Sequence, residues 1–234
     1  NNIYYYNANQ TASIGTDANG RDLFANSNTG MRINPTITDA IVLANTNKGY
    51  SYSLTSKLEK QFSNGWYFMS AYNFGEARDI MTGGSIAYSS WRDQLTVNGN
   101  NQANLSFSDF DQRHRVITAG SYRKNWGENA ATTLSIFYQG YNQGRTSFSV
   151  IGDVNGDFLA ANDLLYVPTA TELQAMNFAD IVSGGNVLYS AAAQKEAFEA
   201  YITDNSYLNS IRGSFSERNA LVLPWLNLID LNIV

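Results

Sequence analysis

The chain of 234 residues carries a formal net charge of −5, a single histidine and no cysteine. A nucleic-acid binder needs a basic face, and a disulfide framework or a thiolate metal site needs cysteines, so these classes are excluded. Charged residues make up 15% of the chain, well below the roughly 25% of an average soluble domain. With 13% aromatic residues, 18 glycines and 3 prolines, the composition favours strands joined by polar turns.

The hydropathy of the chain leaves two classes of protein open. No apolar run approaches the ~18–20 residues of a transmembrane helix; the longest run, 220–226, contains Pro224. The mean hydropathy of −0.29 resembles that of a soluble protein. A transmembrane β-barrel gives a similar value, because only alternate residues of its strands meet lipid.

The first 48 residues predict little regular structure. A short aromatic run at 3–6 precedes a polar stretch at 7–30, whose Asn, Thr, Ser and Gly residues are typical of a long loop. A brief apolar piece follows at 41–44.

Residues 50–74 predict the first antiparallel hairpin. From Tyr50 to Leu58, aromatic and apolar side chains occupy one parity and polar side chains the other, which is the period of a strand with two unlike faces. Asn64 and Gly65 supply a tight turn before the return strand. Each arm has about the 9–11 residues that a tilted strand needs to cross a bilayer.

Residues 113–141 predict a second hairpin, with its turn at 125–129. Arg113 and Arg115 share one parity, and apolar residues such as Val116 occupy the other. This pattern fits a water-filled lumen behind a lipid-facing surface. It fits a soluble sheet with one solvated side equally well, so periodicity alone leaves a barrel and a sandwich open.

The connections between these strands alternate in length. Residues 75–110 form a long polar connection, and residues 142–215 form a longer one with helical character at 171–174 and 191–202. Long outer loops alternate with short turns in transmembrane barrels, whereas sandwiches have shorter and more even links.

The last segment, 206–234, predicts a return to strand, with Pro224 at a strand start or bulge. The alternation of loop lengths favours the barrel over the sandwich. We therefore predict an all-β fold in which residues 1–234 form part of an antiparallel transmembrane β-barrel. Residues 142–215 are expected to form an extracellular-loop subdomain with a short helical insertion.

Several short motifs follow one another along the chain. In chain order they are S-D-F-D-x-x-H-R at 108–115, F-Y-x-G at 137–140, D-x-N-G-D at 153–157, N-D-L-x-Y-x-P at 162–168, R-G at 212–213, R-N at 218–219, P-W at 224–225 and D-L at 230–231. Their order and spacing together resemble those of Oar-like TonB-dependent receptors of Bacteroidetes and their relatives, and the resemblance covers roughly residues 49–234.

The resemblance implies active import across the bacterial outer membrane. Such receptors are barrels of 22 strands with an amino-terminal plug in the lumen, and the TonB complex supplies energy through a short N-terminal box. No plug, TonB box or early strand is visible in the sequence, and the final strands are also expected elsewhere, so the chain resembles part of the carboxy-terminal half. Lipid and lipopolysaccharide would surround the wall, and a surface lipoprotein is a candidate partner.

An alternative is a passive porin-like barrel, or a surface binding or adhesion β-module, without energy coupling. The transported ligand stays open among siderophores, oligosaccharides, peptides and secreted proteins, because specificity lies in loop shape and in scattered side chains.

One loop is a candidate Ca²⁺ site. Asp153, Asn155, Asp157 and Asp163 supply side-chain oxygens in the spacing of calcium-binding loops. Against this reading, the glycine at 156 is one position early relative to an EF-hand loop, and Leu164 replaces the closing glutamate. The alternative is a turn rich in Asx and Gly residues that bonds its own backbone.

Three aromatic residues in the predicted loops, Tyr88, Trp91 and Phe107, are candidate ligand contacts. Exposed rings stack on sugars or contact peptide side chains, although these positions fit an interfacial aromatic belt equally well.

Catalysis is not expected. His114 lies close in sequence to Asp109 and Asp111, but no nucleophile is ordered around it. A structural role in an ion-paired barrel wall, beside two arginines, is the preferred interpretation, and we expect the protein not to be an enzyme.

Overall fold

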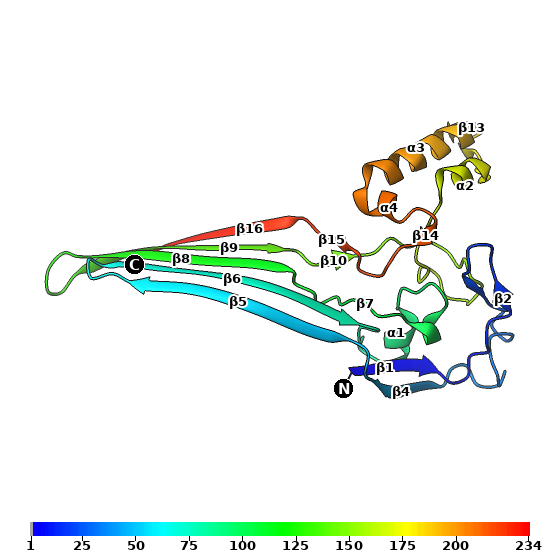
Figure 1. Ribbon diagram of the computed structural model, residues 1–234, viewed down its shortest axis with the longest axis horizontal. Coiled ribbons are helices and arrows are strands. Elements are labelled where there is room, and N and C mark those ends of the chain that lie inside the picture. The colour runs from blue at the N-terminus through cyan, green and yellow to red at the C-terminus, as the bar shows by residue number, and fades with distance from the viewer. Residues whose placement is uncertain (1) are drawn as a thin grey trace.

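The computed structural model describes residues 2–234 and is dominated by one long antiparallel sheet (Figure 1). We name this sheet the wall. Its main strands follow the order β16-β9-β8-β6-β5, and a short strand, β7, adds to the end of β6. The bounds are β5 (Tyr50–Gln61), β6 (Trp66–Asp79), β7 (Ser106–Phe107), β8 (His114–Asn125), β9 (Ala131–Asn142) and β16 (Trp225–Ile233).

Both predicted hairpins are confirmed. β5 pairs with β6 along its whole length, and β8 pairs with β9. Gly65 adopts φ 89° in the first turn, a conformation that an Asn-Gly turn provides without a steric penalty. β6 also pairs with β8, so the two hairpins form one continuous surface.

The two faces of the wall differ in chemistry, as the alternation predicts. On one face, Leu231 lies opposite Ile136, and Leu54 and Leu231 are 71% and 72% exposed. The other face carries most of the charged side chains of the wall together with apolar ones such as Ile117, and Asn73 donates a 2.8 Å hydrogen bond to Thr55 there. Apolar side chains exposed along several strands are stable against lipid, so we name the first face the lipid face and the second the lumen face.

The two ends of the wall carry different connections (Figure 1). One end holds the tight turns of the two hairpins. At the other end the long connections and the segment before β5 fold into a cluster of short elements, which we name the loop assembly. Its paired strands are β1 (Asn2–Asn7) with β4 (Ile41–Thr46), β2 (Gly15–Thr16) with β3 (Asp22–Leu23), β10 (Arg145–Thr146) with β15 (Leu221–Val222), β11 (Tyr166–Val167) with β14 (Ser214–Phe215) and β12 (Ile181–Ser183) with β13 (Asn186–Tyr189).

All helices of the described residues lie in the loop assembly. Their bounds are α1 (Ala87–Arg92), the 3-10 turn η1 (Asn100–Gln102), α2 (Ala170–Ala175), α3 (Ala191–Asp204) and α4 (Ser206–Ser210). The predicted helices at 171–174 and 191–202 are confirmed by α2 and α3. A small core of Val167, Ile202 and Leu208, each fully buried, joins α3 and α4 to β11.

Two sequence predictions are wrong in part. Residues 206–210 form α4 and not a strand, because Asn205 Oδ1 accepts the N–H of Leu208 as an N-cap and Leu208 enters the small core. The connection predicted at 75–110 begins with the last residues of β6 and contains α1, whose six residues are too short to show a helical period.

Within residues 2–234 the wall is an open sheet with β5 and β16 at its edges, so the described part of the chain does not close into a barrel. The count of 22 strands therefore stays a prediction. Among the described helices, none has the length and apolar character needed to cross a bilayer.

Candidate functional site

Buried ion pairs hold the base of the loop assembly on the wall. Arg145 lies 2.5 Å from Asp111, and the two side chains are 4% and 0% exposed. The other carboxylate oxygen of Asp111 accepts the N–H of Ala77 on β6 at 2.7 Å. The guanidinium of Arg145 also covers one side of the Phe107 ring, 3.5 Å from its centroid. This contact set fixes the start of the 143–224 connection to the end of the wall.

The residues after β14 return to the same place. Arg218 donates to Asp79 Oδ1 at 2.5 Å, and Asn219 donates to Asp109 Oδ1 at 2.5 Å. Asn219 also donates to the carbonyl of Phe107 and adopts φ 58°, which asparagine tolerates better than most residues. Both ends of the long connection are thus anchored beside β7.

The predicted ion pairing of the wall arginines is confirmed in part. Arg113 pairs with Glu76, which also bonds Arg78 at 3.0 Å. Arg115 forms no ion pair within residues 2–234, and its Nε is buried without a partner there. His114 Nδ1 lies 2.7 Å from the hydroxyl of Tyr72, a contact within the wall with no nucleophile in it.

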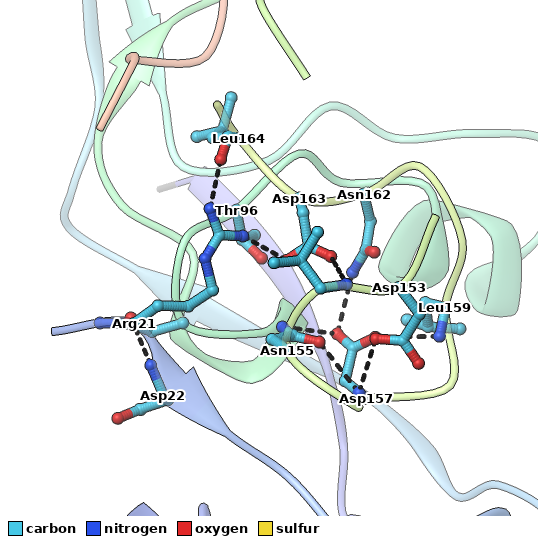
Figure 2. Close-up of polar contacts among 12 residues, drawn as sticks. Arg21, Asp22, Thr96, Asp153, Asn155, Asp157, Leu159, Asn162, Asp163 and Leu164 are labelled. Atoms are coloured by element: carbon cyan, nitrogen blue, oxygen red, sulfur yellow. Dashed lines mark hydrogen bonds and ion pairs between the residues drawn. The ribbon is translucent and has the colours of Figure 1, made fainter. Parts of the chain in front are cut away.

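The candidate calcium loop forms a closed network of hydrogen bonds (Figure 2). Asp153 Oδ1 accepts the N–H groups of Gly156 and Asp157, and its Oδ2 accepts that of Phe158 at 2.9 Å. Asn155 Oδ1 accepts the Asp157 N–H at 2.9 Å. Asp157 in turn accepts the N–H of Leu159 at 2.9 Å. Because backbone donors already occupy these oxygens, the geometry favours the self-bonded turn over a calcium cage.

Asp163, the fourth predicted ligand, already has a cation beside it. Arg21 Nη1 lies 2.5 Å from Asp163 Oδ1, with the two side chains 2% and 0% exposed, and Figure 2 shows the guanidinium reaching across to this carboxylate. Arg21 also donates to the carbonyl of Leu164 at 2.5 Å. Within residues 2–234, no three His, Asp or Glu side chains are grouped to hold a metal ion. Calcium binding stays an untested prediction.

Burial alters the acidity of one residue in this loop. Asp157 is 3% exposed, and its burial raises the pKa of the carboxyl above the ordinary value. Hydrogen bonds from the side chains of Asn155 and Asn162 and from the Leu159 N–H partly offset this effect. Asp157 therefore keeps its proton to a higher pH than a solvated aspartate does.

The three predicted aromatic contacts are not brought together. Tyr88 and Trp91 lie on α1 with their ring centroids 6.0 Å apart. Trp91 is 4% exposed and donates to Asn101 Oδ1 at 2.9 Å, so the expectation that it is an exposed loop ring is wrong. Phe107 lies between the guanidinium groups of Arg78 and Arg145, at 3.8 and 3.5 Å from its centroid, and serves as part of the anchor.

Two cavities open into the loop assembly. The larger has a volume of about 730 Å³ and is lined mainly by carboxamide side chains, with Lys48 as its charged residue and Tyr4 as its aromatic one. The smaller has a volume of about 180 Å³ and lies beside α1, where Tyr88 and Trp91 line it. Sequence reasoning found these two aromatic residues but missed Arg21 and Arg145, whose partners lie 142 and 34 residues away.

Among curated proteins and among solved structures, no match to the chain was found. The family model of the outer membrane beta barrel domain matches residues 1–233. This match agrees with the lipid face of the wall and with the short turns at one end and the long connections at the other. The chain belongs to the outer membrane β-barrel domain family, and its place is the bacterial outer membrane.

Proposed function

We propose that this chain supplies part of the wall and the outer loops of an Oar-like, TonB-dependent transporter that imports a ligand actively. One observation carries the proposal. Residues of two shared motifs, far apart in sequence, meet at the base of the loop assembly, where Asn219 donates a hydrogen bond to Asp109. Two motifs that contact each other in the fold support the resemblance to Oar-like receptors better than isolated sequence matches do.

Each part of the chain has a task in this proposal. The wall separates lipid from the lumen, and the loop assembly faces the cell exterior, because outer-membrane barrels carry their long connections outside. The two cavities and Tyr88 offer ligand contacts. Further strands complete the barrel, a plug closes it and the TonB complex drives it. Lipopolysaccharide contacts the lipid face, and a surface lipoprotein is a proposed partner. We assign no catalytic role to the chain.

Transport by the intact gene product tests the proposal. A strain lacking the gene is compared with the same strain carrying the wild-type gene, by growth on a panel of single iron, sugar and peptide sources. We expect at least one source to require the gene, and uptake of that source to stop when an uncoupler removes the proton gradient. Normal growth on every source would contradict import.

Vesicle swelling separates the active transporter from the passive alternative. The purified full-length protein is placed in lipid vesicles, which are then diluted into isotonic solutions of neutral sugars of increasing size. A plugged receptor leaves swelling at the level of empty vesicles. Rapid swelling that falls with sugar size would instead show an open pore and overturn energy-coupled import.

A further inference from the structure

The smaller cavity of the loop assembly has the features of a binding site for a small charged molecule. Its volume is about 180 Å³, and it is enclosed by segments from five places in the chain. A water molecule occupies about 30 Å³ of liquid, so the cavity holds roughly six waters or one small organic molecule of similar volume. The lining segments are residues 7–10, 28–32, 38–39, 88–91 and 157–159.

Two opposite charges line this cavity without pairing. Arg32 and Asp39 are both half-buried, and neither forms an ion pair with any residue of the described 2–234. Asp39 Oδ1 accepts a 2.7 Å hydrogen bond from Asn7, and its Oδ2 has no bonding partner in that part of the chain. The guanidinium of Arg32, with five N–H donors, has none there either. A cation and an anion that line the same small cavity without pairing suit a ligand that carries both charges.

The third charged group of the cavity is already satisfied. Asp157 also lines the space, but its carboxylate accepts hydrogen bonds from Leu159, Asn155 and Asn162. It therefore serves the loop and leaves Arg32 and Asp39 as the pair that is free to meet a ligand.

The uncharged lining combines polar side chains with a group of apolar ones. Met31 and Trp91 are 7% and 4% exposed, so both are held firmly in the loop assembly, and Leu159 adds a third apolar side chain. A buried apolar surface beside charged groups provides a place for a hydrocarbon side chain.

We propose that this cavity binds a free α-amino acid with an apolar side chain. The ligand carboxylate pairs with Arg32, its ammonium group pairs with Asp39, and its side chain contacts Met31 and Trp91. A guanidinium fork matches a carboxylate, and charge-assisted hydrogen bonds are among the strongest in proteins. The inference depends on the loop assembly alone and holds whether the barrel is an active transporter or a passive one.

Calorimetric titration of the purified full-length protein in detergent tests this inference with three probes. L-Leucine carries both charges, 4-methylpentanoic acid lacks the ammonium group and 3-methylbutylamine lacks the carboxylate. We expect saturable binding of leucine with a Kd below about 1 mM. Each probe that lacks one charge should bind at least about tenfold more weakly, because it leaves one cavity charge without a partner.

Matched variants locate the binding. Arg32→Gln and Asp39→Asn should each weaken leucine binding by about tenfold or more. Arg123→Gln is the matched control, because Arg123 is an exposed arginine at the opposite end of the wall. This variant should bind leucine as the wild type does. Heat-dependent gel mobility shows which variants are folded. Absence of leucine binding, or equal binding of the three probes by the wild type, overturns the inference even if a variant fails to fold. Unchanged leucine binding by folded Arg32→Gln overturns it as well.

Discussion

Replacement of Arg145 by methionine should loosen the base of the loop assembly while leaving the wall in place. Arg145 and Asp111 form a 2.5 Å ion pair that is almost fully buried. Methionine retains an apolar contact with Phe107. The Asp111 carboxylate keeps its hydrogen bond from the N–H of Ala77 but loses the guanidinium that lies 2.5 Å away in the wild type. Breaking a buried pair by removing one partner costs about 3–5 kcal/mol, which increases the population of opened loops roughly a hundredfold or more.

Native-state proteolysis of the full-length protein in detergent measures this opening. Cleavage within 146–220 should accelerate, because the rate follows the open population when opening and closing are fast. Arg92→Met is the matched control, since Arg92 and Asp93 form a pair that is 45% and 55% exposed. An exposed pair contributes about 0–1 kcal/mol, so this control should change cleavage little.

A double variant separates the lost ion pair from lost packing. Arg145→Met combined with Asp111→Leu removes both charges and should restore much of the stability that the single change removes. Equal cleavage rates for Arg145→Met and Arg92→Met would refute the assignment of Arg145 as an anchor.

Four further outcomes follow from the fold. Leu231→Arg on the lipid face should destabilise the protein folded in vesicles by about 2–4 kcal/mol. Asn232→Arg on the lumen face should fold almost normally. Heat-dependent gel mobility measures the folded fraction of both variants. Burial raises the pKa of Asp157, so the contribution of this residue to the free energy of unfolding should fall as pH rises from about 3.8 to the pKa of the folded state. Urea unfolding at several pH values gives the difference in the free energy of unfolding between the wild type and Asp157→Asn. A difference that does not change with pH contradicts the prediction. EDTA should leave the melting temperature unchanged, because N–H donors occupy the oxygens of the 153–163 loop; a loss that Ca²⁺ restores would support the calcium site. Thr169→Ala removes the capping box of α2 and should cost about 1 kcal/mol, seen as faster hydrogen exchange in that helix.

The wall could be predicted from the sequence because its determinants are local. Alternate residues of β5 and β6 point to opposite faces, and one face is apolar, so the period and the Asn-Gly turn together fix the pairing. The helices α2 and α3 were predicted for a similar reason. The good helix formers of the run at 191–202 are neighbours in sequence, so the signal for that helix is local.

The loop assembly could not be predicted in the same way. Arg21 lies in a polar stretch that reads as a loop, and its partner Asp163 is 142 residues away. Nothing near Arg21 in the sequence distinguishes it from a solvated arginine. Trp91 is expected from the sequence to be an exposed ring because it lies in the predicted loop at 75–110, yet the fold buries it against Asn101. Such positions depend on contacts between segments that carry no local period.

The loop assembly depends on polar contacts because its segments are too short to bury much apolar surface. Among the described residues, the fully buried side chains include Arg21, Asn100 and Asp163 beside Leu173 and Ile202. Each buried hydrogen bond contributes modestly when made but costs more when left unmade, so a network of this kind specifies one arrangement of loops. Anchors such as Arg145 therefore hold the loops in place, while the cavity-lining side chains of other residues remain open to change. If the proposed ligand site is correct, we expect that changes to side chains such as Arg32 alter ligand specificity without disturbing the attachment of the loops to the wall.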